Sequence, residues 1–274
     1  ADKAGGIGIS ASFGSSSSQS NQQSSTDTAK ASTINAGGNV TIKAVGDGQN
    51  SNLTAQGANI TAAGTTTLKA DGAVNLLASQ NTSTETSKSS NSAASVGVAA
   101  QLGNGGAGMG FTASASAGKG AGAGNGVTYT NTQVAGNTVN ITSGGDTTLK
   151  GAVVTGNTVN ANVGGNLKVE SLQDTNTYKD SSQQVGGSVM VGISSTGPLS
   201  GNLNLAKTNI NSNFTSVGEQ SAIRAGDGGF NVNVQGKTDL VGGQITSTQA
   251  AIDNNKNSYE AKQGTTVTDL QNTA

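Results

Sequence analysis

Short runs in which apolar and polar residues alternate recur along the chain, with glycine and asparagine between them. The run VTIKA at residues 40–44 puts its valine, isoleucine and alanine on one face and its threonine and lysine on the other. Leu68 followed by Lys69, and Leu167 followed by Lys168, repeat this pattern. Alternation with period two is typical of a β-strand with one buried face. We therefore expect the lysines to point outward from an apolar interior.

The clearest internal repeat lies in the middle of the chain. Residues 136–155 read GNTVNITSGGDTTLKGAVVT and residues 156–175 read GNTVNANVGGNLKVESLQDT. The second copy begins twenty positions after the first (156 − 136), and the first five letters are identical. A unit of this size suits one coil of a parallel β-helix, in which three short strands are joined by turns. Glycine and asparagine fill the turns because they adopt positive φ most easily.

The repeat also predicts which side chains stack between neighbouring coils. Val139 should lie on Val159 inside the core, one coil apart. Asparagines at equivalent positions are expected to form internal amide ladders: Asn137 with Asn157, and Asn140 with Asn160 if these lie in turns.

A longer repeat overlies the short one. The segment IGISASFG at residues 7–14 matches VGVAAQLG at residues 96–103, 89 positions further on (96 − 7), and residues 188–193 are a third copy. Each copy precedes a turn-rich patch, at 15–18, 104–108 and 197–201. A second alternating strand then returns, as at 109–117 and 203–205. We expect these segments to be β-hairpins that leave the coils as excursions.

The two repeats divide one continuous repeat domain into coil blocks and excursions. The expected segments are an excursion or partial repeat at 1–30, coils at 31–79, a Ser/Gly-rich stretch with a hairpin excursion at 80–132, coils at 133–175, an excursion at 176–205, and coils with a C-terminal tail at 206–274. The fold class is all-β, a parallel β-helix with β-hairpin excursions. Six or seven coils would form a rod of about 30 Å, which is short for a fibre, so we expect a piece of a longer protein.

Composition supports a repeat architecture and excludes several classes of function. The chain has 42 Gly, 1 Pro and a net charge of −1, whereas disordered chains are usually Pro-rich and highly charged. With no Cys there is neither a disulfide scaffold nor a thiolate metal site. The balanced charge offers no basic patch for nucleic acid. The chain contains no run of about 20 apolar residues, so no membrane-spanning helix is predicted. No signal peptide is predicted in residues 1–10.

Residues able to support catalysis are sparse. The mid-chain coils before Asp174 contain only the carboxylates Asp146 and Glu170, and the chain has no His to act as a base. We therefore expect no enzyme activity, no catalytic residues, no cofactor and no metal. The GDG triplets at 46–48 and 226–228 are interpreted as plain turns, because calcium repeats need several consecutive copies.

Two other features have a functional and a structural interpretation. The run GKGAGAGNG at 118–126 lacks the residues of a phosphate-binding loop and is expected to be a flexible linker. Four lysines, at 43, 69, 150 and 168, are candidates for a basic stripe that binds glycans or anionic surfaces. The alternative is that outward lysines keep a solvated β-face from sticking to other molecules. No specific binding residue is predicted.

Several blocks resemble the haemagglutinin repeats of filamentous haemagglutinin-type exoproteins. These blocks are GGNVTIKA, GANITAAGTTTLKADGAVNLLASQNTSTETSKSS and GNTVNITSGGDTTLKG. In the most similar class the coils end in an A-x-Q-x-T run followed by a Ser-rich excursion; residues 78–82 fit that run and residues 172–175 fit it in part. Such repeats are similar to those in the second repeat region of contact-dependent growth inhibition exoproteins.

The resemblance implies a right-handed parallel β-helix and a role at the surface of a Gram-negative bacterium. Exoproteins of this kind are virulence-associated, are exported by two-partner secretion through a dedicated outer-membrane transporter, and end up secreted or at the cell surface. Some deliver a C-terminal toxin to a neighbouring cell, and others are adhesins that bind host or bacterial ligands. The implied partners are the transporter and a target-cell envelope or receptor, with no stable membrane span. The excursions would either pack on the coils or act on the target envelope.

Overall fold

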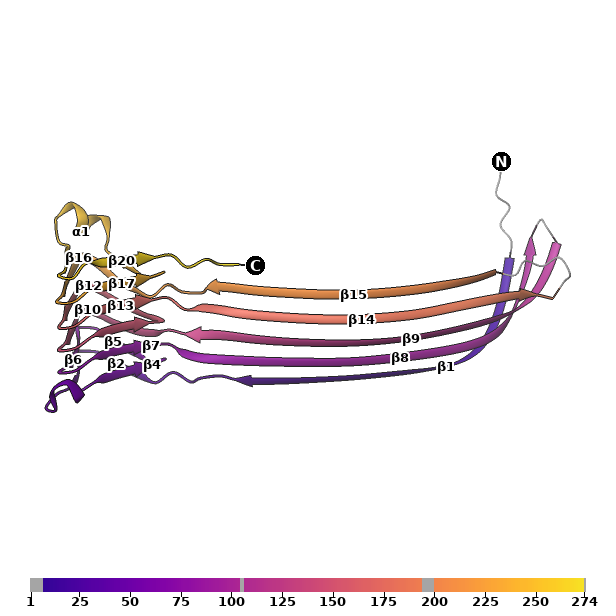
Figure 1. Ribbon diagram of the computed structural model, residues 1–274, viewed down its shortest axis with the longest axis horizontal. Coiled ribbons are helices and arrows are strands. Elements are labelled where there is room, and N and C mark those ends of the chain that lie inside the picture. The colour runs from indigo at the N-terminus through magenta and orange to yellow at the C-terminus, as the bar shows by residue number, and fades with distance from the viewer. Residues whose placement is uncertain (1–6, 104–105, 194–199, 274) are drawn as a thin grey trace. The chain divides into compact units, whose positions relative to one another are not determined.

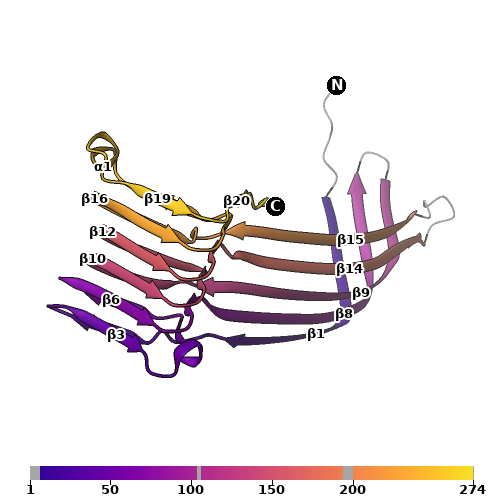
Figure 2. The same ribbon diagram turned by 60° about the vertical axis from the view of Figure 1, so that its left-hand side comes forward.

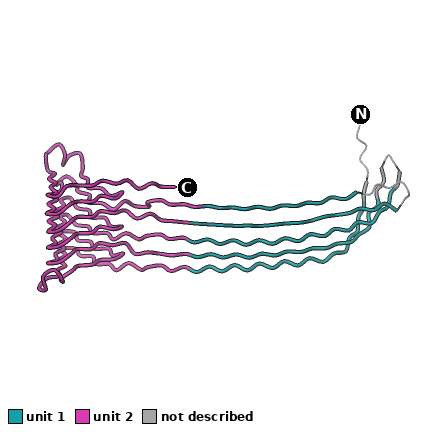
Figure 3. Tube along the Cα trace, in the orientation of Figure 1, with its two compact units in different colours: residues 1–25, 84–125, 177–212 teal, residues 26–83, 126–176, 213–274 magenta. Residues whose placement is uncertain are grey.

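The computed structural model describes residues 7–103, 106–193 and 200–273, and nearly all of its elements are β-strands (Figure 1). The predicted all-β fold class is confirmed. The chain forms two units, shown in Figure 3. The sheet unit comprises the described parts of 1–25, 84–125 and 177–212, and the coil unit comprises 26–83, 126–176 and 213–273.

The sheet unit is built from five long strands in one sheet. In spatial order they are β1 (Ile7–Asp27), β8 (Ser79–Gly103), β9 (Gly106–Thr130), β14 (Gln173–Gly192) and β15 (Ser200–Val217), and all but their coil-side ends lie in this unit. Neighbouring arrows point in opposite directions (Figure 1). The Ser181 hydroxyl donates to Asn209 Oδ1 and the Ser188 hydroxyl donates to Asn202 Oδ1, each at 2.9 Å. From the first bond to the second, the residue number on β14 rises by seven (188 − 181) while the residue number on β15 falls by seven (209 − 202). The two strands are therefore antiparallel.

The coil unit contains two sheets of short strands. The nine-stranded sheet holds β2 (Thr33–Ala36), β3 (Val40–Ala44), β5 (Asn59–Ala62), β6 (Thr65–Ala70), β10 (Thr132–Ser143), β12 (Ala152–Val163), β16 (Ala222–Val234), β18 (Gln244–Thr246) and β19 (Ser258–Ala261). The six-stranded sheet holds β4 (Leu53–Gln56), β7 (Val74–Leu77), β11 (Thr147–Lys150), β13 (Leu167–Glu170), β17 (Thr238–Val241) and β20 (Thr265–Thr268). The described helices are the 3-10 turn η1 (Gly48–Asn50) and α1 (Gln249–Asp253), both in this unit.

Strands of the coil unit pair in parallel, and in the mid-chain coils their offset equals the sequence repeat. Strand β10 pairs with β12 so that Thr132 lies beside Ala152, and β11 pairs with β13 so that Thr147 lies beside Leu167. Both offsets equal the twenty-position period of the sequence (152 − 132 and 167 − 147). The parallel neighbours β3, β6, β10, β12 and β16 lie side by side in Figure 2. The predicted parallel pairing and its period are confirmed.

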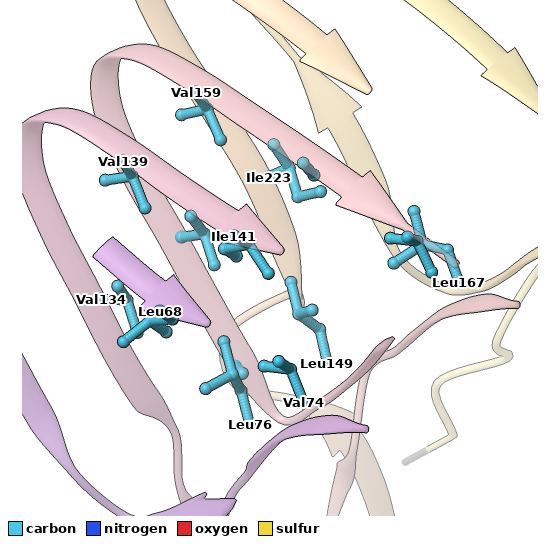
Figure 4. Packing of buried hydrophobic residues seen from close by; sticks show 14 of the residues in the cluster. Leu68, Val74, Leu76, Val134, Val139, Ile141, Leu149, Val159, Leu167 and Ile223 are labelled. Atoms are coloured by element: carbon cyan, nitrogen blue, oxygen red, sulfur yellow. The ribbon is translucent and has the colours of Figure 1, made fainter. Parts of the chain in front are cut away.

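The interior of the coil unit is a stack of aliphatic side chains (Figure 4). Val139 lies beside Val159 in the register of β10 and β12, and both side chains are 0% exposed, as predicted. Leu149 lies between Leu76 and Val169 in the six-stranded sheet. Each coil adds a few such residues to a continuous core. Fully burying one of these side chains contributes about 1.5–3 kcal/mol to the stability of the fold.

The internal amide ladder predicted for Asn137 and Asn157 is wrong, because both side chains are exposed. Gly136 interrupts the alternation immediately before Asn137, so the asparagine turns toward solvent. The other predicted pair does form a bond, although within strands and not in turns: Asn160 Nδ2 donates to Asn140 Oδ1 at 2.8 Å.

Two segments expected to be irregular are strands instead. Residues 15–18, predicted as a turn, continue β1, and the predicted linker 118–126 lies inside β9. In the linker segment alternate glycines face serine or asparagine side chains of β8; a Cβ placed on Gly120 would come within 2.9 Å of Ser89 Oγ. The missing side chains therefore make room for their neighbours, while backbone pairing holds the strand.

Other predicted turns have mixed outcomes. The triplet 46–48 is a turn, with φ of +116° at Gly46 and +50° at Gly48. The triplet 226–228 instead forms a register shift within β16 opposite β12. Of the predicted patches 104–108 and 197–201, residues 104–105 and 197–199 lie outside the described residues, and the rest belong to β9 and β15.

Candidate functional site

The four lysines considered as a basic stripe lie in two separate sheets. Lys43 and Lys69 are direct neighbours on β3 and β6 of the nine-stranded sheet. Lys150 and Lys168 belong to β11 and β13 of the six-stranded sheet. All four side chains face outward and are exposed, as the alternation predicted. They therefore do not form one continuous stripe along a single sheet.

Glu170 accounts for the arrangement of the second lysine pair. Its carboxylate lies 3.3 Å from Lys150 Nζ and 2.7 Å from Lys168 Nζ. Partial burial alone would raise the pKa of Glu170, but hydrogen bonds and positive charge from the two lysines outweigh it and hold the pKa below its ordinary value. A carboxylate stabilised in its charged form is a poor proton donor, so this cluster suits a structural role better than acid catalysis.

Asp146, the other mid-chain carboxylate, is used in a turn. Its Oδ1 accepts a hydrogen bond of 2.7 Å from the backbone amide of Asn166, one coil away. Asp227 of the second GDG triplet accepts a 2.7 Å bond from the Thr248 hydroxyl. Within the described residues, no three His, Cys, Asp or Glu side chains are grouped so as to hold a metal ion.

The main surface feature is in the sheet unit, where one face of the five-stranded sheet is apolar. Ser95 and Ser114 share a hydrogen bond across β8 and β9, and Ile193 donates its amide to Met109 O across β14 and β9. The Ser188–Asn202 bond links β15 to β14, and a bond from Gln22 to Glu85 links β1 to β8. Together these pairs relate all five strands, so alternation along each strand assigns its side chains to a face. The exposed large apolar side chains that share the first face, called here the apolar face, are Ile9, Phe13, Val96, Val98, Met109, Phe111, Val185, Val189, Val191, Ile193, Leu203 and Leu205.

These side chains are exposed to an unusual degree. Phe13 is 84% exposed, Leu203 is 72% exposed and Val96 is 63% exposed. Phe13, Val96, Val189 and Leu203 line a shallow hollow together with Ala113. A large apolar surface in water is a mark of an interaction site.

The opposite face of the same strands, called here the polar face, carries mostly small and hydrophilic side chains, with Met190 and Ile210 as its exposed large apolar residues. Residues that line a second hollow there include Ser95, Ser116, Ser188, Asn202 and Asn204. The sheet therefore has an apolar and a polar side, although it is a single layer within its own unit.

The two faces also differ in charge, with lysines on the apolar face and acidic side chains on the polar face. In the described part of the sheet unit, the cations on the apolar face are Lys88, Lys119, Lys179 and Lys207, and the acids on the polar face are Glu85 and Asp180. Lys119 and Lys207 lie beside Val185 and Leu205, where the apolar side chains end. Sequence reasoning identified the alternating apolar runs but missed this sorting. The signal was available in the odd or even position of each lysine along its strand.

The comparisons with known proteins agree with this repeat architecture. Residues 11–187 match the family model described as hemagglutinin repeat. The chain is 43% identical over 249 residues to a 16S rRNA endonuclease CdiA of Enterobacter cloacae subsp. cloacae, and 41% identical over 251 residues to a deoxyribonuclease CdiA of Dickeya dadantii. It is 40% identical over 253 residues to a tRNA nuclease CdiA of Escherichia coli. Each of these alignments covers 90% of the chain. No solved structure gives a significant match.

The chain belongs to the hemagglutinin repeat family, a class of structural repeats. More particularly, it is a filamentous haemagglutinin-type repeat region of the kind found in contact-dependent growth inhibition exoproteins, as its repeats predicted. It spans only 7% or 8% of the length of the three curated relatives. Those relatives are named for cleaving three different nucleic acids yet share this segment, so the segment is not what distinguishes their activities.

The part of the chain that the structure describes includes no helix with the length and apolar character needed to cross a bilayer.

Proposed function

We propose that the chain is a non-catalytic segment of a secreted exoprotein that helps to present or deliver a toxin, carried elsewhere in the same protein, to a neighbouring bacterium. One observation carries the proposal: relatives named for three different nuclease activities each match 90% of this chain. A common segment joined to variable activities is what a delivery apparatus requires.

The coil unit is proposed to wind as a right-handed parallel β-helix. Parallel strands offset by one sequence repeat support the coiled path. Right-handedness follows from strand twist, which makes about 98% of parallel crossover connections right-handed. Six coil-and-excursion segments with the boundaries predicted above are part of this proposal.

The proposed location is the bacterial surface, reached through an outer-membrane two-partner-secretion transporter. The absence of Cys supports this route, because no disulfide can form before the unfolded chain has passed through a narrow pore. The proposed partner at the far end is the envelope of the target cell or a receptor in it. No nucleic-acid contact, cofactor or metal enters the proposal.

The test uses the full-length parent exoprotein in its own bacterium, with two internal deletions. The first replaces residues 84–125 with a short Gly/Ser linker and so removes the β8–β9 part of the sheet unit. The control deletes residues 136–155, which is one repeat, and joins Ala135 to Gly156 without changing the register of the coils. Surface display, attachment to target cells and inhibition of target growth are measured for both.

Delivery predicts that the 84–125 deletion keeps surface display but loses at least ten-fold in growth inhibition, whereas the one-coil deletion retains it. An adhesin segment, the alternative function, predicts that attachment is lost in proportion to inhibition. Full inhibition by the 84–125 deletion would show that the excursion is only a spacer and would contradict the delivery role.

A further inference from the structure

We propose that the apolar face of the sheet unit is a self-association surface, on which a second copy of this chain packs face to face and antiparallel to form a two-layer sheet. The observation behind this is a single five-stranded layer whose twelve large apolar side chains on one face are all at least 40% exposed. A sheet with one apolar face normally covers it with another layer about 10 Å away.

The size of the apolar face matches what a stable pair of proteins needs. Five strands spaced about 4.8 Å apart are about 24 Å wide, and the eight steps along the strand from Val185 to Ile193 extend about 27 Å. The flat footprint is therefore about 650 Å², and side-chain relief raises the accessible area above this value. Specific dimers bury about 800 Å² per partner, so one copy of this face suffices to cover another.

The lysines determine the orientation of the two copies. Lys119 and Lys207 border the apolar side chains at the end where Val185 and Leu205 lie, and Lys88 and Lys179 lie further along the same face. Parallel stacking would put the two lysine rows about 10 Å apart, which like charges oppose. Antiparallel stacking puts the rows at opposite ends of the interface, where long stems cover apolar surface and the ammonium groups reach water.

A second copy of the chain is a better partner for the apolar face than a lipid surface, because of the backbone groups at the edges of the sheet. The sheet is open, with β1 and β15 as its edge strands. Edge strands carry unpaired backbone N–H and C=O groups, which cost several kcal/mol each in hydrocarbon. Face-to-face packing covers the apolar side chains and leaves both edges in water.

The first experiment measures the mass of the purified 274-residue chain by sedimentation velocity over a hundred-fold concentration range. We expect a reversible monomer–dimer equilibrium. The variant Val96→Asp, on the apolar face, should raise the dissociation constant at least 100-fold. The matched control Ala93→Asp lies on the same strand but on the polar face, and it should leave the constant within about two-fold. Val96 and Ala93 are both exposed, so neither charge needs to disturb folding of the monomer.

Circular dichroism and thermal melting confirm that each variant is folded. If Val96→Asp fails this check, Val189→Asp on β14 replaces it, because Val189 is 51% exposed on the same face. Flotation with vesicles of phosphatidylglycerol is run in parallel with each variant.

The second experiment tests the orientation with spin labels at Ser89→Cys, an exposed position on the polar face. Ser89 is seven steps along the strand from Val96, which lies level with the middle of the apolar face, so each label is about 24 Å from the centre along the strands. Antiparallel copies place the two labels about 50 Å apart, whereas parallel copies place them under about 30 Å apart.

A chain that stays monomeric throughout the range overturns the proposal, as does a dimer that Val96→Asp leaves unchanged. A monomer that floats with vesicles and loses flotation in Val96→Asp also overturns it and assigns the face to lipid. A short distance between the labels refutes the antiparallel arrangement.

Discussion

A charge placed inside the coil unit tests the packing between coils most directly. In β12, Val159 lies between Val139 of β10 and Phe230 of β16, and its side chain is 0% exposed. Further along the same strand, Asn162 faces outward and is exposed. The substitutions Val159→Asp and Asn162→Asp therefore introduce the same side chain on opposite faces of one strand.

The expected magnitude follows from burial. Val159→Ala alone should cost about 2 kcal/mol, the sum of lost transfer energy and a small cavity. Val159→Asp adds the burial of a carboxyl group with no polar partner, which costs several kcal/mol more even when the group is protonated. A total above about 4 kcal/mol is a large part of the roughly 5–15 kcal/mol that holds a typical domain together. Asn162→Asp should change stability by less than about 0.5 kcal/mol.

Urea unfolding followed by far-UV circular dichroism measures these differences, and pH separates charge from cavity. Burial raises the pKa of the introduced carboxyl in the folded state, so the charge penalty is absent below the ordinary aspartate pKa and grows as pH rises. The stability gap between Val159→Asp and Val159→Ala should therefore be smallest near pH 3, where only the cost of burying the uncharged carboxyl remains, and should widen toward pH 7. Equal midpoints for Val159→Asp and Asn162→Asp at pH 7 would refute the assigned register.

Three further predictions concern polar and backbone contacts of the coil unit. Glu170→Gln should cost up to about 1 kcal/mol at pH 7; because the folded pKa of Glu170 is lowered, this loss should vanish as pH falls through that pKa, as urea midpoints from pH 7 to pH 3 would show. Thr132→Val should cost about 1–3 kcal/mol by thermal melting, because the buried Thr132 hydroxyl donates to Leu77 O at 2.6 Å and accepts from Ala58 N at 3.1 Å; an unchanged melting temperature would contradict this bond. Gly151→Ala should cost about 2–4 kcal/mol, since Gly151 has φ of +63° and a Cβ would lie 2.5 Å from Ala78 Cβ, while Gly38→Ala, in open space, should cost little; equal losses in these two variants would count against this turn geometry.

Sequence reasoning succeeded where the relevant information is local or strictly periodic. The mid-chain repeat was enough to align Val139 with Val159, because parallel coils place equivalent residues side by side. Outward lysines followed from alternation alone. The outward direction of the Asn137 side chain could not be predicted from alternation, because Gly136 interrupts the alternation immediately before it.

The long strands could not be derived from local composition. Glycine-rich residues 118–126 and serine-rich residues 15–18 have the composition of loops. What makes them strands is pairing with distant segments, since the glycines of β9 leave space that Ser89 and its neighbours on β8 occupy. That complementarity joins two different strands, and no short window along the chain contains both sides of it.

The parallel register of the coil unit survives the long excursions that interrupt it. Gln133 pairs with Asn59 at an offset of 74 (133 − 59), and Leu167 pairs with Thr238 at an offset of 71 (238 − 167), yet both pairings are parallel like those one repeat apart. Closing a longer loop costs only about 0.6 kcal/mol per doubling of its length, and each excursion returns antiparallel to its own outgoing strand. Coil packing therefore constrains only the points where an excursion leaves and returns. The strands between those points are free to carry an apolar and a polar face that the core does not require.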